Sequence, residues 1–227
     1  MKKGNSRPII AIITGGSPMN LAEVQEIADA VLLVWYPGEE GGNAVADVVF
    51  GDVTPSGKLP ITFPKSLDQL PAYEDYTMKG RTYRYMTEEP LYPFGFGLSY
   101  TTFSYNKIEL SNKKVKKGES VKVAATVTNT GNIDAEEVVQ LYISALDMEP
   151  GLPLYSLKGF KRIALKKGET KTVEFELPAA AFTLANDAGE MIERRGQYKI
   201  SVSGSLPGKR SAELGAAKGL EAMLTVQ

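Results

Sequence analysis

The stretch Val121-Lys122-Val123-Ala124-Ala125-Thr126-Val127-Thr128 carries apolar side chains at every second position. A period of two is typical of a β-strand with one buried face. The same alternation returns at residues 139–143, 173–177 and 198–202, and a last apolar run covers residues 220–226. Turn-forming residues separate these runs at intervals that predict an antiparallel β-sandwich over residues 104–227.

Two nearly identical short segments interrupt this alternation. Residues 116–119 and 166–169 both read Lys-Lys-Gly-Glu, and each copy leads into an alternating run. In a nearly neutral chain they are predicted to be solvated turns rather than a binding patch. Residues 205–219 are small and polar, so we expect them to form a mobile loop before the last strand.

Residues 8–63 have a different pattern, which is typical of an α/β unit. Ile9-Ile10-Ala11-Ile12-Ile13 and residues 30–36 are continuous apolar runs, and such runs predict parallel strands covered on both faces. Asn20 with Glu23 predicts a capping box for the helix between the two strands. Asn43 is then predicted to cap a second helix.

The end of this unit is marked by a glycine and by two prolines. Gly51 is placed for the C-terminal turn of the second helix. Residues 59–63, which Pro60 and Pro64 interrupt, are predicted to form a third short strand. The unit is therefore either a small flavodoxin-like domain complete in itself or the tail of a larger α/β domain.

We favour the tail of a larger domain. A parallel sheet of about three strands with two helices leaves apolar faces bare, and such faces are rarely stable in water. The exposed half-sheet also predicts a partner or self-association, because a large apolar patch seldom stays solvated.

A connector rich in aromatic residues joins the two halves. Residues 65–103 show no clear helical pattern, and prolines and glycines divide them into turns. Flexible linkers are poor in aromatic residues, so these rings are predicted to pin the connector onto a surface. The expected division is therefore 1–77 for the α/β part, 78–103 for the connector and 104–227 for the sandwich. The rings are Tyr73, Tyr76, Tyr83, Tyr85, Tyr92, Phe94, Phe96, Tyr100 and Phe103.

The composition excludes several classes of function. The 227 residues include neither cysteine nor histidine, which excludes thiolate nucleophiles, cysteine-held metals and the serine-hydrolase relay. We therefore expect no metal and no cofactor. The net charge of −1 provides no positive electrostatic field that would attract nucleic acid. No apolar run approaches the roughly 20 residues that span a bilayer. Nucleic acid and membrane are thus not expected as partners.

The compartment stays open. The basic start at residues 1–6 lacks the small-residue cleavage site of a signal peptide, and the lack of cysteine fits the cytosol. Exported proteins can also lack cysteine. A periplasmic or extracellular location is expected if the chain is part of an exported polysaccharide-degrading enzyme, and a cytoplasmic one otherwise.

Two adjacent carboxylates, Glu39 and Glu40, are the candidate substrate-binding residues. They follow a predicted parallel strand, at the edge where α/β folds place ligand contacts. The surrounding glycine-rich loop lacks the Lys-Ser/Thr pair of a P-loop, and two acidic residues would repel a phosphate. Adjacent carboxylates rarely act on one bond, so the simpler interpretation of the pair is that it favours a helix N-terminus.

Several long motifs resemble one known family. Residues 35–44, 50–53 and 55–60 resemble the end of the C-terminal α/β sandwich domain of glycoside hydrolase family 3. Residues 92–103 are similar to that family's link to its fibronectin type III-like domain, and residues 157–163 and 168–170 to the body of that domain. The stretch Lys79-Gly80-Arg81-Thr82-Tyr83-Arg84-Tyr85 looks more like the β-xylosidase branch than the β-glucosidase branch.

The resemblance implies a fold and a function. The fold would be a partial parallel α/β sheet followed by an immunoglobulin-like, fibronectin type III-like β-sandwich. Family members hydrolyse β-linked sugars with retention, using an Asp on an N-terminal barrel and typically a Glu from an upstream loop. Both positions precede the matched region, so no catalytic residue is expected in this chain. It would be a non-catalytic scaffold whose partners are the barrel, or a separate chain supplying it, and a β-linked oligosaccharide.

Two further interpretations stay open. The chain could be a self-standing carbohydrate-binding or adhesion module, because flat aromatic rings stack on sugar faces. The candidate rings for this are Tyr73, Tyr76, Tyr83, Tyr85 and Tyr92. It could also gain hydrolase activity by completion with a second chain that supplies the missing domains.

Overall fold

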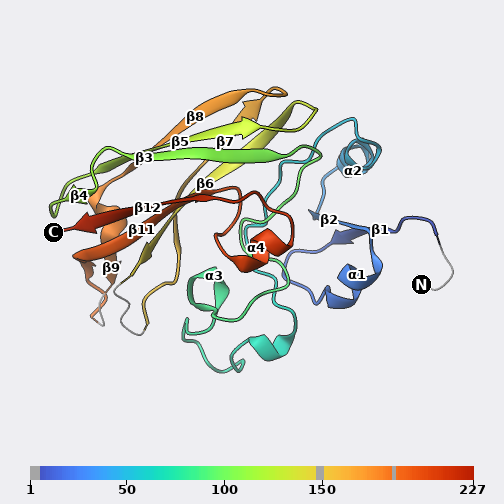
Figure 1. The fold of residues 1–227 in the computed structure, drawn as a ribbon. Coiled ribbons are helices and arrows are strands. Elements are labelled where there is room, and N and C mark those ends of the chain that lie inside the picture. The colour runs from blue at the N-terminus through green and yellow to red at the C-terminus, as the bar shows by residue number, and fades with distance from the viewer. Residues whose placement is uncertain (1–5, 147–150, 186–187) are drawn as a thin grey trace.

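A computed structural model describes residues 6–146, 151–185 and 188–227, so most of the basic start lies outside the described residues. Figure 1 shows a β-sandwich at one end of the molecule and a small α/β portion at the other, with the C-terminus at the sandwich end. This arrangement confirms the predicted fold class of partial α/β plus all-β.

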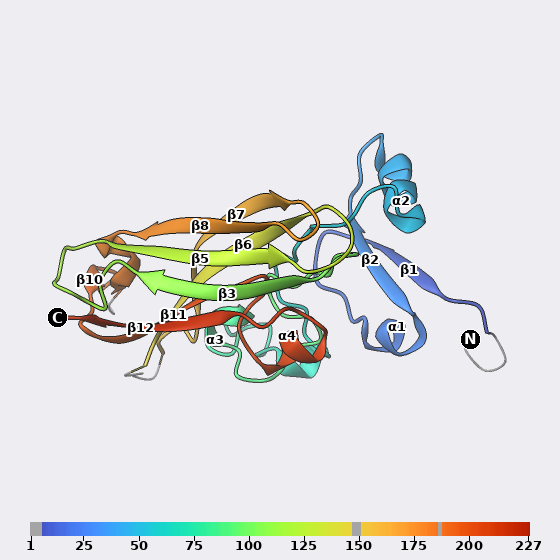
Figure 2. The same ribbon diagram turned by 45° about the horizontal axis from the view of Figure 1, so that its top comes forward.

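The sandwich consists of two sheets. One has five strands in the order β4-β12-β11-β6-β7, and the other has three in the order β3-β5-β8. The strands are β3 (Phe103–Leu110), β4 (Lys114–Val115), β5 (Val121–Asn129), β6 (Ala135–Ala145), β7 (Ser156–Leu165), β8 (Thr170–Leu177), β11 (Gly196–Ser203) and β12 (Leu220–Val226). A small hairpin of β9 (Thr183–Ala185) and β10 (Met191–Glu193) follows η2 (Ala179–Phe182) at the far end, as Figure 2 shows.

The predicted alternation produces the core of the sandwich. In β5, the side chains of Val121, Val123 and Val127 are fully buried, while Lys122 between them is exposed. Val123 pairs with Phe175 across the β5–β8 ladder, and both belong to the main hydrophobic cluster. The strand predictions made from these runs are confirmed.

The segment before β12 is better ordered than its composition suggested. The interpretation of residues 205–219 as a mobile loop is wrong, because the segment contains α4 (Lys209–Glu213) and two buried serines. Ser205 Oγ and Ser211 Oγ lie 2.8 Å apart, and Ser211 Oγ donates to the carbonyl of Leu206 at 2.6 Å. Small polar side chains here satisfy one another inside the fold.

The α/β portion holds a parallel sheet of two strands, β1 (Ile10–Thr14) and β2 (Ala30–Trp35), with α1 (Ala22–Ile27) between them. Ile13 and Leu33 on one face pack against the cluster formed by Leu21, Phe63 and Leu91. On the other face Ile10 and Ile12 are 45% and 47% exposed. These strands were expected to be covered on both faces, but the described residues cover only one of them.

Both predicted helix caps need correction. The first helix begins at Ala22 with Leu21 at its N-cap, and Asn20 Oδ1 only accepts a turn hydrogen bond from the amide of Ala22 at 3.2 Å. The second helix, α2 (Gly41–Phe50), begins two residues before Asn43. Its N-cap residue is Glu40, and Gly41, the first helical residue, lies so close to Pro37 that a Cβ there would be 2.4 Å from the proline side chain.

The other end of α2 matches the prediction. Gly51 is the C-cap residue with a φ of 86°, and its amide bonds to the carbonyl of Val48. This left-handed backbone is the conformation for which glycine is preferred.

The third strand predicted at residues 59–63 does not form. Leu59 and Phe63 instead donate backbone hydrogen bonds to the carbonyls of Phe96 and Tyr92 in the connector, both at 2.9 Å. Phe63 and Tyr92 form only an isolated antiparallel bridge. Pro60 and Pro64 lack the amide hydrogens that a regular ladder needs, which explains why the segment is irregular.

The connector folds back along the outer face of the five-stranded sheet (Figure 1). The aromatic stretch of residues 65–103, to which the connector belongs, contains two short helices that the pattern did not indicate, η1 (Leu67–Gln69) and α3 (Thr82–Tyr85). Tyr83 stacks on Phe94 with ring centroids 4.2 Å apart and meets Tyr142 of β6 edge-on at 6.2 Å. Tyr83 and Phe94 thus pin the connector onto the sandwich as predicted, whereas Tyr73 and Tyr76, which were expected to do the same, are 88% and 87% exposed.

Candidate functional site

The predicted candidates Glu39 and Glu40 lie between β2 and α2, at the carboxyl end of the parallel sheet, and both are exposed. Glu40 Oε2 accepts a hydrogen bond from Asn43 Nδ2 at 2.5 Å, so this carboxylate organises the first turn of α2. Among the described residues, no group of three or more acidic side chains is arranged to hold a metal ion.

The same edge of the sheet has a constrained backbone. Trp35 adopts a φ of 54°, which is unfavourable for a bulky residue, and its carbonyl accepts from the amide of Gly15 at 3.1 Å. A Cβ on Gly16 would lie 2.6 Å from the ring of Tyr36, and one on Gly41 would lie 2.4 Å from Pro37. Tyr36 is 80% exposed and its ring can move aside, so only Gly41, which meets the rigid Pro37 ring, is closely constrained.

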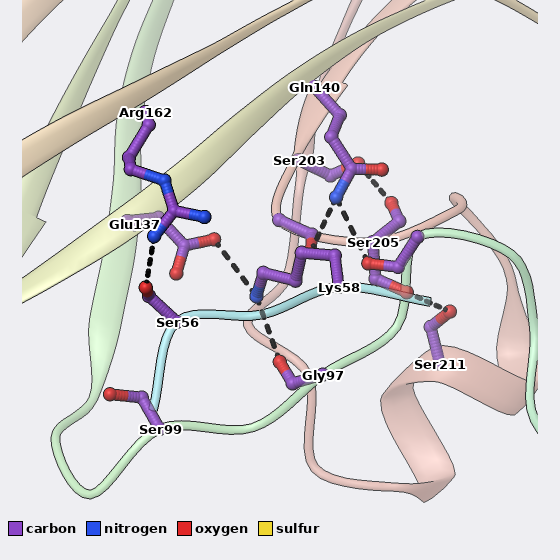
Figure 3. A network of polar contacts seen from close by, with 12 residues as sticks. Ser56, Lys58, Gly97, Ser99, Glu137, Gln140, Arg162, Ser203, Ser205 and Ser211 are labelled. Carbon is purple, nitrogen blue, oxygen red and sulfur yellow. Dashed lines mark hydrogen bonds and ion pairs between the residues drawn. The ribbon is translucent and has the colours of Figure 1, made fainter. Parts of the chain in front are cut away.

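A second polar site joins the α/β portion to the sandwich (Figure 3). Lys58 Nζ lies 3.3 Å from Glu137 Oε1 of β6, and their side chains are only 13% and 4% exposed. Lys58 Nζ also donates to the carbonyl of Gly97 at 2.8 Å, and Tyr105 OH donates to Glu137 Oε1 at 3.1 Å. The junction is thus built around a buried ion pair.

Burial determines the electrostatics of this junction. Desolvation raises the pKa of Glu137, and the positive charge of Lys58 and the hydrogen bond from Tyr105 oppose that rise only in part. The pKa of Tyr105 lies well above its usual range because the phenol is buried and faces the carboxylate.

An exposed counterpart lies beside the buried pair. Arg162 Nη1 of β7 contacts Glu136 Oε2 at 2.9 Å and donates to Ser56 Oγ, while the two charged side chains are 53% and 47% exposed. Glu136 and Glu137 are neighbours on β6 with opposite orientations, so the chain offers a buried and a solvated ion pair at one junction.

The connector reaches the sandwich through a buried amide. Gln140 Nε2 donates to the carbonyls of Gly95 and Gly204 at 3.0 and 2.9 Å, and Gln140 Oε1 accepts from Tyr142 OH. Gly95 has a φ of 73°, and a Cβ at this position would lie 2.1 Å from Gln140 Oε1. A side chain at position 95 is therefore incompatible with this contact.

Arg210 of α4 provides a third link between the parts. Its Nε and Nη2 donate to the carbonyl of Leu91 at 3.1 and 3.0 Å, and Nη2 approaches Gln25 Oε1 of α1 at 3.5 Å. The guanidinium thus connects the sandwich to both the connector and the α/β portion.

A cavity of about 160 Å³ lies between the connector and the loop before α4. Its walls include Thr62, Tyr83, Glu88, Tyr155 and Arg210. Glu88 belongs to the connector and Arg210 to α4, so the cavity is a feature of the interface between these parts.

The exposed aromatic rings fall into two groups. Tyr73 and Tyr76 are 88% and 87% exposed, whereas Tyr83, Tyr85 and Tyr92 are partly buried in the connector. Arg81 holds the loop that displays the exposed rings, because its Nε donates to the carbonyl of Thr77 at 3.0 Å and its Nη2 donates to that of Asp75.

None of the helices in the described part of the chain has the length and apolar character needed to cross a bilayer.

Comparison with known proteins covers both halves of the chain. Residues 2–100 match the family described as the glycosyl hydrolase family 3 C-terminal domain, and residues 137–206 match the fibronectin type III-like domain. The periplasmic β-glucosidase of Salmonella typhimurium is 39% identical over 212 residues, which are 88% of this chain and 28% of that protein. The xylan 1,4-β-xylosidase of Xylanibacter ruminicola is 43% identical over 199 residues, 87% of this chain and 23% of its own length.

Solved structures show the same relationship. A β-glucosidase from Erythrobacter marinus superposes with a TM-score of 0.81 at 33% identity, over 96% of this chain and 28% of that one. A family 3 β-glucosidase from Bifidobacterium adolescentis gives 0.81 at 31% identity, over 96% and 33%. The chain thus spans about a quarter to a third of the length of these relatives.

Proposed function

The chain belongs to glycoside hydrolase family 3, of whose members it represents the C-terminal portion, and we propose from this premise that it is a non-catalytic scaffold. In the complete protein it would support a retaining, exo-acting β-glycosidase. The stretch at residues 79–85 favours a xylosidase over a glucosidase. The N-terminal barrel would come from the same polypeptide or from a separate chain.

The observation that carries this proposal is the open face of the β1–β2 sheet. Ile10 and Ile12 are about half exposed on a parallel sheet, although such sheets are normally covered on both faces. Tyr36 and Phe50 add exposed apolar surface next to β2 and at the end of α2. We propose that the N-terminal portion covers this face, and that without it the isolated chain self-associates there.

The chemistry of the described carboxylates agrees with a scaffold. Retaining hydrolysis needs two carboxyl groups about 5–5.5 Å apart across one bond, one nucleophilic and one protonated. Glu39 and Glu40 are adjacent and exposed, and Glu40 is engaged with Asn43. We therefore propose for these two residues at most contacts with sugar hydroxyls, as part of one wall of the substrate pocket in the complete protein. The division into 1–77, 78–103 and 104–227 belongs to the same proposal.

Co-expression with the missing portion tests this function. The part of the Salmonella typhimurium relative that precedes its match to this chain would be produced alone and together with this chain, and this chain would also be produced alone. All three samples would be assayed on aryl β-glucosides and β-xylosides. We expect turnover only from the co-expressed pair. Turnover by this chain alone would refute the scaffold.

A matched pair of variants tests the docking face. Ile12→Glu adds a charge to the open face and is expected to abolish co-purification and reduce turnover at least tenfold. Met191→Glu adds the same charge to an exposed site in β10, at the far end of the sandwich (Figure 2), and is expected to leave both unchanged. Light scattering of the isolated chain would show the larger species disappearing in Ile12→Glu alone. Equal behaviour of the two variants would contradict the assigned face.

A carbohydrate-binding module is the second candidate, and the exposure of Tyr73 and Tyr76 favours it. Two solvated rings on a loop held by Arg81 could stack on the faces of sugar units. Affinity electrophoresis in gels containing xylan or soluble cellulose would then retard the chain, and Tyr73→Ala with Tyr76→Ala would remove the retardation. Unretarded migration of the original chain would count against this function.

A further inference from the structure

The ion pair between Lys58 and Glu137 connects parts that are 79 positions apart in the sequence. Lys58 follows α2 in an irregular segment, and Glu137 lies on β6 of the sandwich. In Figure 3 the lysine side chain extends from its segment between the glutamate and the backbone of Gly97. The amide of the next residue, Leu59, donates to Phe96 at 2.9 Å, so the pair anchors a stretch of backbone as well.

The charged and titratable groups around Glu137 come from several elements. Lys58 and Tyr105 of β3 both contact its Oε1, and Tyr142 lies close enough to Tyr105 to raise that phenol's pKa further. A Cβ on Gly204, after β11, would lie 2.1 Å from the same oxygen, so this side is closed by backbone. On the neighbouring position of β6, Glu136 is engaged with Arg162 of β7. Lys58 is thus the only cation that directly contacts the Glu137 carboxylate among the described residues.

We propose that Glu137 is a proton-responsive link between the α/β portion and the sandwich. As a carboxylate it holds Lys58 and the adjoining segment against β6. As a neutral acid it releases Lys58, while the sandwich stays folded. This device is separate from the scaffold role and holds whether or not that role is correct.

The geometry explains why protonation releases the lysine. A neutral carboxyl group can still accept the hydrogen bond from Tyr105, so its burial is tolerated. The ammonium of Lys58 would then keep only the carbonyl of Gly97 in a largely dry site. A buried charge with one neutral acceptor is unfavourable, and the long lysine side chain can move its charge into water.

The sign of the linkage separates this release from acid unfolding. Burial raises the pKa of Glu137 above its ordinary value of 4.5, so the folded state takes up this proton more readily than the unfolded chain. The contribution of Glu137 to the free energy of unfolding therefore increases as the pH falls through the folded pKa toward 4.5. Protonation of Glu137 therefore loosens the junction but does not itself destabilise the folded sandwich.

Amide hydrogen exchange measured by NMR between pH 7.5 and 5 tests the link. The protection factor of the Leu59 amide, corrected for the intrinsic exchange rate, is expected to fall as the pH is lowered and Glu137 takes up its proton, by up to about tenfold per pH unit. The protection factors of amides in β11 are expected to stay constant. A Leu59 protection factor that does not change with pH in the original chain would overturn the proposal.

Two substitutions assign the response to Glu137. Glu137→Gln, which mimics the neutral acid and keeps an oxygen for Tyr105, is expected to show the low protection at every pH. Glu136→Gln removes the exposed neighbouring charge and is expected to keep the full pH response. Should Glu137→Gln fail to fold, Lys58→Gln provides the same test, because it removes the group that is released. A pH response that survives in Glu137→Gln or Lys58→Gln would overturn the proposal.

Discussion

A Gly95→Ala variant is expected to lose at least about 3 kcal/mol of unfolding free energy. Gly95 has a left-handed backbone with a φ of 73°, which costs an alanine about 1–2 kcal/mol. The added Cβ would lie 2.1 Å from Gln140 Oε1 and 2.7 Å from Tyr142 OH, so the buried amide would have to move. Overpacking costs about 1–3 kcal/mol, and a disrupted buried hydrogen bond costs a similar amount.

Gly118→Ala is the matched control for this prediction. Gly118 also has a left-handed backbone, with a φ of 87°, but a Cβ there would meet no atom within 4 Å. Urea denaturation should therefore show a loss of only about 1–2 kcal/mol for the control. The difference between the two variants measures the contact with Gln140, and equal losses would show that this contact does not constrain position 95.

Much of the sandwich could be predicted because its signals are local. The alternation in residues 121–127 depends only on which side of the strand each residue faces, and the structure buries Val121, Val123 and Val127 accordingly. The two Lys-Lys-Gly-Glu turns are also confirmed. The amides of Lys116 and Lys166 donate to the carboxylates of Glu119 and Glu169 at 2.8 and 2.7 Å, so the same four residues form the same turn twice.

The α/β portion was harder to predict because its contacts lie far apart in the sequence. Residues 59–63 have the composition of a strand, but their backbone partners are Tyr92 and Phe96 of the connector. No local pattern indicates which distant segment will accept those hydrogen bonds. Asn43 is a residue type that is common at helix N-caps, yet the helix begins at Gly41, next to Pro37.

The junction was missed, although one signal for it was present. Glu137 shares its side of β6 with Val139, Leu141 and Ile143, which all face the core. A carboxylate at a strand position that faces the core predicts a buried charge, and a buried charge needs a partner of opposite charge. The identity of that partner could not be predicted, because Lys58 precedes it by 79 positions and lies in a segment without periodicity.

Removing the partner of this buried carboxylate is expected to have the second large effect. Lys58→Met leaves Glu137 charged and 4% exposed, and an uncompensated buried charge costs about 3–5 kcal/mol. Lys58→Met combined with Glu137→Gln removes both charges and keeps an acceptor for Tyr105. This double variant is expected to recover at least about 2 kcal/mol of the loss, because replacing both members of a buried pair is often nearly neutral.

The pH dependence distinguishes this explanation from lost packing. In Lys58→Met the pKa of Glu137 lacks the opposing charge and lies further above its unfolded value, so the deficit should shrink between pH 7.5 and pH 5 as the carboxylate takes up a proton. A deficit caused by packing alone would not change with pH. Arg162→Met breaks the exposed pair with Glu136, so urea denaturation should show a loss below about 1 kcal/mol. If Lys58→Met cost no more than Arg162→Met, or if the double variant recovered nothing, the buried charge would not be the group that links the two parts of this chain.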